Sequence, residues 1–155
     1  MILEGSKPPP EIHFQSEPAL SADAFVDILR RSTLAERRPV EDRATIEGML
    51  RNAGLILTAR LDGRLVGIAR AITDFSYCTY LSDLAVDVAC QRRGIGRELI
   101  RRIHEAAGLN TTLILLSAPQ AEGYYPHIGL KKHGSCWLIP PKGTIASTQS
   151  NTETN

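Results

Sequence analysis

The chain has 155 residues, a net charge of +1 and a hydrophobic content of 43%. This balance is typical of a single globular domain, and it gives no overall electrostatic bias toward nucleic acid or a membrane surface. No apolar run approaches the ~20 residues of a transmembrane helix, and the N-terminal residues lack the basic-then-apolar order of a signal peptide. Three scattered cysteines without metal-ligand spacing predict small buried side chains in a reducing cytoplasm, and no metal site.

The first half of the sequence predicts helices followed by an antiparallel meander. In chain order we expect an extended arm, a short strand and two amphipathic helices, at residues 1–10, 12–14, 22–31 and 41–52. Ser21 is a candidate N-cap, and Gly54 follows the second helix as a C-cap signal. Strands are then expected at 55–61, 64–72 and 80–86, with Asp62-Gly63 as a hairpin turn between the first two.

The second half predicts a crossover unit. A helix with apolar residues at spacings of four follows Gly94 and ends at Gly108, and the continuous apolar run Leu113–Leu116 predicts a strand that is covered on both faces. Strand, helix and strand form a right-handed unit with a parallel pair. A short helix at 120–127, a last strand at 136–139 that includes Trp137 as a core residue, and a polar tail complete the expected elements.

The segment Gln91–Arg97 joins the strand at 80–86 to the following helix and has the character of an anion site. Its glycines permit close approach of the backbone, and the free N–H groups of a helix N-terminus favour phosphate. A Walker A loop would need Lys and Ser/Thr after Gly96, and a dinucleotide fingerprint would need glycine at Leu99. Neither pattern is present, and Gln-x-x-Gly-x-Gly remains.

This pattern resembles the acetyl-CoA pyrophosphate loop of the GNAT N-acetyltransferase superfamily. A second segment resembles the GNAT motif in which an aromatic pair ends in tyrosine, here Tyr125, and is followed by glycine and an apolar residue, here Gly129-Leu130. The order of the elements from Ser21 to Ile139 also matches. The chain departs from the pattern at Ala118, where many members have a cofactor-contacting asparagine.

The resemblance implies an α/β (α+β) fold with a mixed, mostly antiparallel sheet of about six or seven strands and about four flanking helices. Two parallel strands would splay apart at the cofactor site. We expect one GNAT domain at residues 11–140, between a flexible arm at 1–10 and a flexible polar tail at 141–155.

The resemblance also implies how acetyl-CoA is held. Main-chain groups of the strand would contact the pantetheine arm, and the loop would hold the pyrophosphate; the residues concerned are Leu84, Ala85, Val86, Gln91, Arg92, Arg93, Gly94, Ile95, Gly96 and Arg97. A main-chain N–H near Leu84 would face the thioester oxygen as an oxyanion donor.

Catalytic side chains are fewer. Tyr125 is the expected general acid for the leaving thiolate, and a core or interface tyrosine is the alternative. Asp83 is a possible general base, or a salt-bridged structural carboxylate; His127 and His133 are further candidates for the base.

The expected acceptor site is the least specified. Phe75 and Tyr77 precede the cofactor strand, and Arg37 and Arg38 lie in the connection between the first two helices, a candidate lid. These arginines could bind an anionic group of the acceptor or remain solvated surface charges.

Taken together, the sequence predicts an N-acetyltransferase that transfers the acetyl group of acetyl-CoA to a primary amine by direct attack in a ternary complex. The acceptor is a small molecule or a peptide amine, and a homodimer is expected from the family. The alternatives are a silent acyl-CoA sensor domain and a nucleic-acid-binding module suggested by the arginines of the loop and helix, Arg92, Arg93, Arg97, Arg101 and Arg102. No aromatic residues are interleaved with these arginines, which disfavours the nucleic-acid module.

Overall fold

A computed structural model describes residues 10–143, so nearly all of the predicted arm and most of the predicted tail lie outside the described residues. The described chain divides into two units, of which the first ends at Ala118 and the second begins at Pro119.

The first unit is built on one five-stranded sheet with the order β1-β2-β3-β4-β5. The first four strands are antiparallel neighbours, and β5 is parallel to β4. The strands are β1 Ile12–Ser16, β2 Leu55–Leu61, β3 Arg64–Thr73, β4 Cys78–Val86 and β5 Thr112–Leu115. This confirms a mixed, mostly antiparallel sheet, with five strands in place of the expected six or seven.

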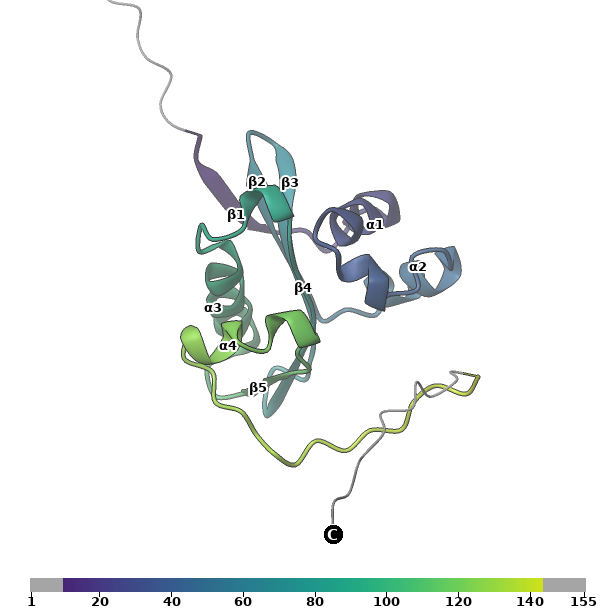
Figure 1. Ribbon diagram of the computed structural model, residues 1–155, viewed down its shortest axis with the longest axis vertical. Helices are drawn as coiled ribbons and strands as arrows, with labels where there is room; N and C mark the ends of the chain where they lie inside the picture. Colours follow the sequence, from purple (N-terminus) through teal and green to yellow (C-terminus); the bar gives the residue numbers. More distant parts are fainter. Residues whose placement is uncertain (1–9, 144–155) are drawn as a thin grey trace, which may run out of the picture. The chain divides into compact units, whose positions relative to one another are not determined.

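Helices cover both faces of this sheet (Figure 1). Helices α1 (Ala22–Arg31) and α2 (Arg43–Arg51) lie on one side, and α3 (Ile95–Ala107) lies on the other. Two short 3-10 segments, η1 (Leu34–Arg37) and η2 (Val88–Cys90), follow α1 and β4. Within residues 10–143 no helix is long and apolar enough to cross a membrane.

Local signals in the sequence explain where several elements begin. The Ser21 hydroxyl accepts from the Ala24 N–H at 3.2 Å, which confirms it as the N-cap of α1. Asp42 caps α2 in the same way, and the helix therefore begins at Arg43 rather than at residue 41. Asp62 and Gly63 both have positive φ, 48° and 80°, as a two-residue hairpin turn requires.

Apolar side chains are buried on both faces of the sheet. Phe25, Ile28 and Leu29 of α1 are fully buried with Ile46 of α2 and Ile68 of β3. On the opposite face α3 buries Ile95, Leu99 and Ile103. Burial of such side chains supplies ~1.5–3 kcal/mol each and is the main stabilising contribution to the sandwich.

Strand β5 differs from the prediction. Leu113–Leu116 was expected to be covered on both faces, but Ile114 and Leu116 are 56% and 55% exposed. The strand is short and forms the edge of the described sheet, where an apolar run need not be covered on both faces.

The cysteines were also expected to be buried. Only Cys90 is buried, because Cys78 begins β4 beside an exposed turn and Cys136 lies outside the helices and strands, where it is exposed.

The second unit has less regular structure than expected. The predicted helix at 120–127 is replaced by a 3-10 turn, η3 (Pro119–Ala121), and one turn of helix, α4 (Tyr124–His127). Pro126 lacks an N–H and is tolerated only in a first helical turn, so the helix cannot extend back through Gly123.

The predicted last strand at 136–139 is also wrong. No strand forms there within the described residues, and Trp137, expected in the core, is 93% exposed. Residues 136–139 have the apolar composition of a strand, but a strand also needs a hydrogen-bonded neighbour, and none pairs with this segment in the described chain.

Candidate functional site

A β-bulge divides β4 into two halves, and the odd-numbered residues of the two halves direct their peptide groups to opposite edges of the strand. Near its start the register pairs Leu81 with Ala71, whereas beyond the bulge Asp83 pairs with Arg70, and Ser82 is the extra residue. Such an insertion exchanges the residues whose peptide groups face the neighbouring strand. The bulge therefore sets which main-chain groups of β4 are free.

Beyond the bulge the free groups belong to Leu84 and Val86. Asp87 donates its N–H to the Val66 carbonyl at 2.9 Å, so the odd-numbered residues bond β3 in this half of the strand. The peptide groups of Leu84 and Val86 point to the opposite edge. The Val86 carbonyl accepts from the Gln91 side-chain amide at 3.3 Å, in agreement with this orientation.

That opposite edge has no strand beside it. Strand β5 pairs with β4 only from Cys78 to Leu81, and β4 continues to Val86. Within residues 10–143 no other strand pairs with β4 on this side. The predicted splay of the parallel pair is thus present as a gap beside Leu84 and Val86, in which an extended ligand can meet peptide groups that no strand pairs with.

The loop that follows leads directly from this edge to the N-terminus of α3. Gly94 precedes α3 with a φ of 77° and no side-chain cap, and Arg92 also has a positive φ of 61°. The N–H groups of Ile95, Gly96 and Arg97 lie in the first turn, where an α-helix offers no internal acceptor. These donors and the helix dipole favour an anion.

The position of α3 depends on a close approach at Gly67 of β3. A Cβ atom at Gly67 would lie 2.9 Å from Cγ2 of Ile95 and 3.1 Å from Cδ1 of Leu99. Glycine therefore lets the first turn of α3 lie directly on the sheet. By contrast, a Cβ at Gly94 would meet no protein atom within 4 Å, so the space above the loop is open.

The basic residues of this region fall into two groups. Arg101 and Arg102 both bond Glu98, and their guanidinium groups lower the pKa of Glu98 to about 2. The exposed Arg92, Arg93 and Arg97 form no ion pair within the described chain. Only the loop arginines are therefore free for a ligand, which weakens the nucleic-acid alternative because the cluster is smaller than the sequence suggests.

Asp83, the possible general base, is a structural carboxylate in this fold. Its side chain is fully buried, and its two oxygens accept from Arg38 and Arg70. The structure thus favours the salt-bridged alternative, and we do not assign Asp83 a proton-transfer role. Arg70 and Arg38 were missed as its partners, although an arginine inside the apolar run of β3 is a signal that a buried acid lies opposite.

Tyr125 lies in α4 of the second unit and is partly buried. Burial raises the pKa of its phenol, and the adjacent Tyr124 adds to the shift. The two rings contact edge-to-face at 5.4 Å between centroids. The phenol is protonated near neutral pH, as that of an unperturbed tyrosine also is. His127 and His133 are exposed in the same unit.

The three expected acceptor residues lie on two separate segments of the first unit. Phe75 and Tyr77 are exposed on the β3–β4 hairpin, which Asp74 closes by accepting from three backbone N–H groups. The exposed Arg37 lies in η1, and its neighbour Arg38 contacts the middle of β4 rather than the hairpin. The hairpin and η1 therefore meet β4 at different points along its length.

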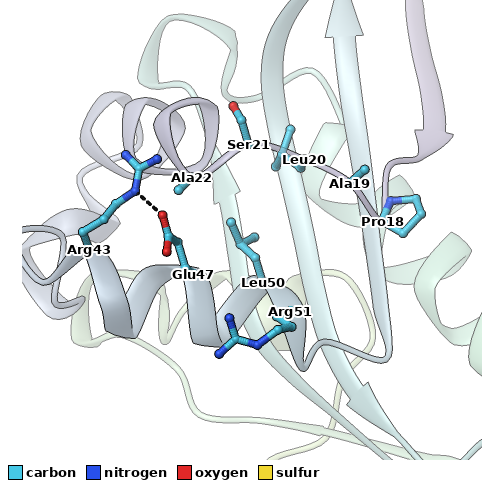
Figure 2. Close-up of a pocket in the computed structure, with 9 residues that line it drawn as sticks. All are labelled: Pro18, Ala19, Leu20, Ser21, Ala22, Arg43, Glu47, Leu50 and Arg51. Carbon is cyan, nitrogen blue, oxygen red and sulfur yellow. Dashed lines mark hydrogen bonds and ion pairs between the residues drawn. The ribbon is translucent and has the colours of Figure 1, made fainter.

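A hollow of about 370 Å³ lies on another part of the unit, and Figure 2 shows the residues that line it. The β1–α1 connection and α2 line it, and the Arg43–Glu47 ion pair crosses one side at 2.7 Å. It includes no residue of β4 or of the glycine loop, so we do not assign it to the acyl donor. No group of three potential metal ligands occurs in residues 10–143.

The family model described as the Acetyltransferase (GNAT) family matches residues 22–130. The chain belongs to this family. Its acyl donor is accordingly acetyl-CoA, and the GNAT domain includes both the open edge of β4 and the glycine loop. No curated protein sequence matches the chain significantly.

Solved structures of GNAT proteins share the fold. A GNAT-family acetyltransferase from Streptococcus pneumoniae TIGR4 has a TM-score of 0.62 and 16% identity over 84% of this chain and 100% of that one. The aminoglycoside N-acetyltransferase AAC(6')-Iy, solved in complex with CoA, has a TM-score of 0.65 and 15% identity over 92% and 99%.

An aminoglycoside acetyltransferase from an uncultured soil metagenomic sample, solved in complex with sisomicin, has a TM-score of 0.62 and 18% identity over 86% of this chain and 97% of that one. At these identities the likeness concerns the fold.

The residues of this GNAT domain fit acetyl-CoA as a ligand. The loop combines free helix N–H groups with unpaired arginines, a donor set that suits a pyrophosphate. The open edge of β4 suits an extended arm that carries amide groups.

Proposed function

We propose that this GNAT domain transfers the acetyl group of acetyl-CoA to a primary amine by direct attack in a ternary complex. The observation that supports this most is the bulged β4, whose free edge beyond Ser82 ends at the anion-binding loop. Acetyl-CoA supplies an acetyl group activated as a thioester. The chain's own contribution is to bind and orient it and to control two protons.

The main chain performs the first part of this work. In our proposal the N–H groups of Gly94–Arg97, with Arg92 and Arg93, hold the pyrophosphate. Leu84, Ala85 and Val86 present peptide groups to the pantetheine arm, and the Leu84 N–H donates to the thioester oxygen. One such oxyanion donor contributes ~3 kcal/mol to transition-state stabilisation.

Tyr125 is proposed as the general acid that protonates the departing thiolate. The GNAT motif supports the role, and a phenol carries its proton at neutral pH whether or not burial raises its pKa. With Asp83 committed to two arginines, we propose that the amine loses its proton to water or to an exposed histidine, His127 or His133.

The acceptor is proposed to be a small-molecule or peptide amine. Two GNAT proteins of the same fold are named as aminoglycoside acetyltransferases, and this favours polyamine-like sugars as the first compounds to test. Phe75, Tyr77 and Arg37 remain proposed acceptor contacts. We further propose that residues 11–140 comprise the catalytic domain, between the arm at 1–10 and the tail at 141–155, and that the chain forms a homodimer.

A thiol-release assay tests the proposal. Acetyl-CoA is mixed with the protein and a panel of aminoglycosides, simple primary amines and short peptides, and free CoA thiol is followed. We expect amine-dependent release with at least one class. Binding of acetyl-CoA without release across the whole panel would instead support the silent sensor domain, and absence of binding would refute both.

A further inference from the structure

A buried cluster of one carboxylate and two guanidinium groups holds the bulge of β4. The Asp83 side chain is 0% exposed, that of Arg70 is 5% exposed and that of Arg38 is 21% exposed. A buried carboxylate is tolerated when its oxygens are paired, and here each oxygen has its own arginine. The cluster is not used by the chemistry proposed above.

Arg70 holds the bulge from the neighbouring strand. Besides Asp83 it bonds the Ser82 hydroxyl at 2.9 Å and the Met49 carbonyl at 3.2 Å. Arg70 and Arg38 together form a clamp on the bulge. Because Arg70 belongs to β3 and is itself buried, its half of the clamp is held in place by the sheet.

Arg38 holds the bulge from the loop between α1 and α2. It follows η1 and bonds the Ser82 carbonyl at 2.7 Å and the Arg37 carbonyl at 2.8 Å, in addition to Asp83. Ser82 is the extra residue of the bulge, and an extra residue is left unpaired by the strand ladder. The Arg38 guanidinium therefore supplies the donor that the partner strand cannot.

We propose that Arg38 is a positioning residue for acyl transfer, which locks the β4 bulge and so aims the Leu84 N–H at the acyl site. The inference deepens the proposed function and rests on it. Without Arg38 the Ser82 carbonyl and one Asp83 oxygen lose their donors, and the bulge can slip by one residue. A slip of one residue turns the peptide groups beyond it to the other edge.

The same contact couples two parts of the site. The loop that includes Arg37, a proposed acceptor contact, reaches the donor strand through Arg38. A rearrangement of this loop would release the bulge, so the donor edge is correctly formed only when the loop is docked. Arg38 thus links acceptor-side structure to the orientation of the oxyanion donor.

The test compares Arg38→Gln, which removes the charge and most donors, with Arg38→Lys, which keeps the charge but lacks the planar fork of donors. With acetyl-CoA and the best amine of the panel, we expect kcat to fall about 10- to 100-fold in Arg38→Gln, the range for a catalytic group misplaced by about 1 Å. The affinity for CoA should fall by a smaller factor than kcat, because the loop at Gly94, which is proposed to hold the pyrophosphate, is untouched. The kcat of Arg38→Lys should lie between those of the wild type and Arg38→Gln.

Arg30→Gln is the matched control, since Arg30 pairs with Glu41 of the same loop at the surface and should leave kcat unchanged. Equal losses of kcat and CoA affinity, or wild-type kcat in Arg38→Gln, would overturn the proposal.

Hydrogen exchange separates failure of this inference from failure of the proposed function. In the ligand-free protein the Asp83 and Ala85 amides, which face β3, should exchange at least about tenfold faster in Arg38→Gln than in Arg30→Gln. If the wild type shows no transfer activity, the proposed function fails while this readout still tests the clamp. Unchanged protection of both amides would refute the clamp whatever the activity.

Discussion

Tyr125 is the proposed general acid. Burial raises its pKa above the usual value of about 10, so the phenol is protonated throughout the neutral range. Tyr125→Phe keeps the ring and removes only the proton donor. We predict a fall in kcat of about 100-fold or more, with the Kd for acetyl-CoA unchanged, measured by thiol release and isothermal titration.

Tyr124→Phe is the control for that substitution, because it alters the neighbouring phenol in the same turn. It should retain most of the activity. A Tyr125→Phe protein that turns over like the wild type would remove Tyr125 from the mechanism.

Gly94 tests the loop with a built-in comparison. Gly94 and Gly63 both have φ near 80°, and a Cβ at either position would meet no protein atom within 4 Å. Alanine should therefore cost a similar ~1–2 kcal/mol of stability at both sites. Only Gly94→Ala should weaken acetyl-CoA binding, by about tenfold or more, since its methyl group enters the space assigned to the pyrophosphate. Equal affinities of the two variants would show that the phosphate lies elsewhere.

At the scale of elements, the docking of α3 on β3 fixes where the anion site lies. Gly67→Ala would put a methyl group 2.9 Å from Ile95, and overpacking of this kind costs ~1–3 kcal/mol. We predict lower stability by urea denaturation, together with weaker acetyl-CoA binding because the first turn of α3 must shift.

A glycine of α2 provides a control in which alanine should raise the stability instead of lowering it. Gly48 lies inside a helix with only the Arg51 side chain near its Cβ position, at 3.9 Å. Gly48→Ala should stabilise the protein by ~0.5–1 kcal/mol. If both variants were equally stable, the close approach at Gly67 would not limit the packing of α3.

The sequence predicts those elements whose signals are local. Ser21 predicts a helix start because its hydroxyl can cap free N–H groups, and Asp62-Gly63 predicts a turn because both residues tolerate positive φ. The alternation of side chains along β4 places Asp83 on the buried face. The bulge at Ser82 is not visible in the sequence, because it depends on the register between two strands. Residues 136–139 have the composition of a strand, but a strand forms only where a neighbouring strand pairs with it, and composition does not predict that pairing.

The site divides in the same way. Gln91–Arg97 can be predicted to be an anion-binding loop from the sequence, because glycines and a helix start coincide there. Arg38 is not, since its role arises from contacts with residues more than forty positions away. A buried acid such as Asp83 does indicate that a cationic partner exists, but the sequence cannot choose among the arginines of the chain.

At the scale of the whole molecule, several carboxyl groups contribute stability that depends on pH. Backbone N–H groups lower the pKa of Asp74 to about 2, and arginines lower that of Glu98 to about 2. The pKa values of Glu17 and Asp87 are also lowered. The unfolded chain, with pKa values near 4, therefore binds more protons than the folded chain in acid.

This sign predicts that stability is full above about pH 5 and is lost progressively toward pH 2. The melting temperature should fall clearly between pH 6 and pH 3, and Asp74→Asn should make the fall shallower. A melting temperature that stays constant over this range would contradict the assigned carboxylate contacts.

We propose that acetyl-CoA lies along the open edge of β4 and on the N-terminus of α3. An NMR titration of the uniformly ¹⁵N-labelled protein with acetyl-CoA tests it most directly, because it reports each backbone amide. We predict the largest shifts at Leu84, Val86 and Gly94–Arg97. This placement of acetyl-CoA would be contradicted if β4 were unaffected and the largest shifts lay around the hollow of Figure 2, at Ser21, Ala22 and Arg51.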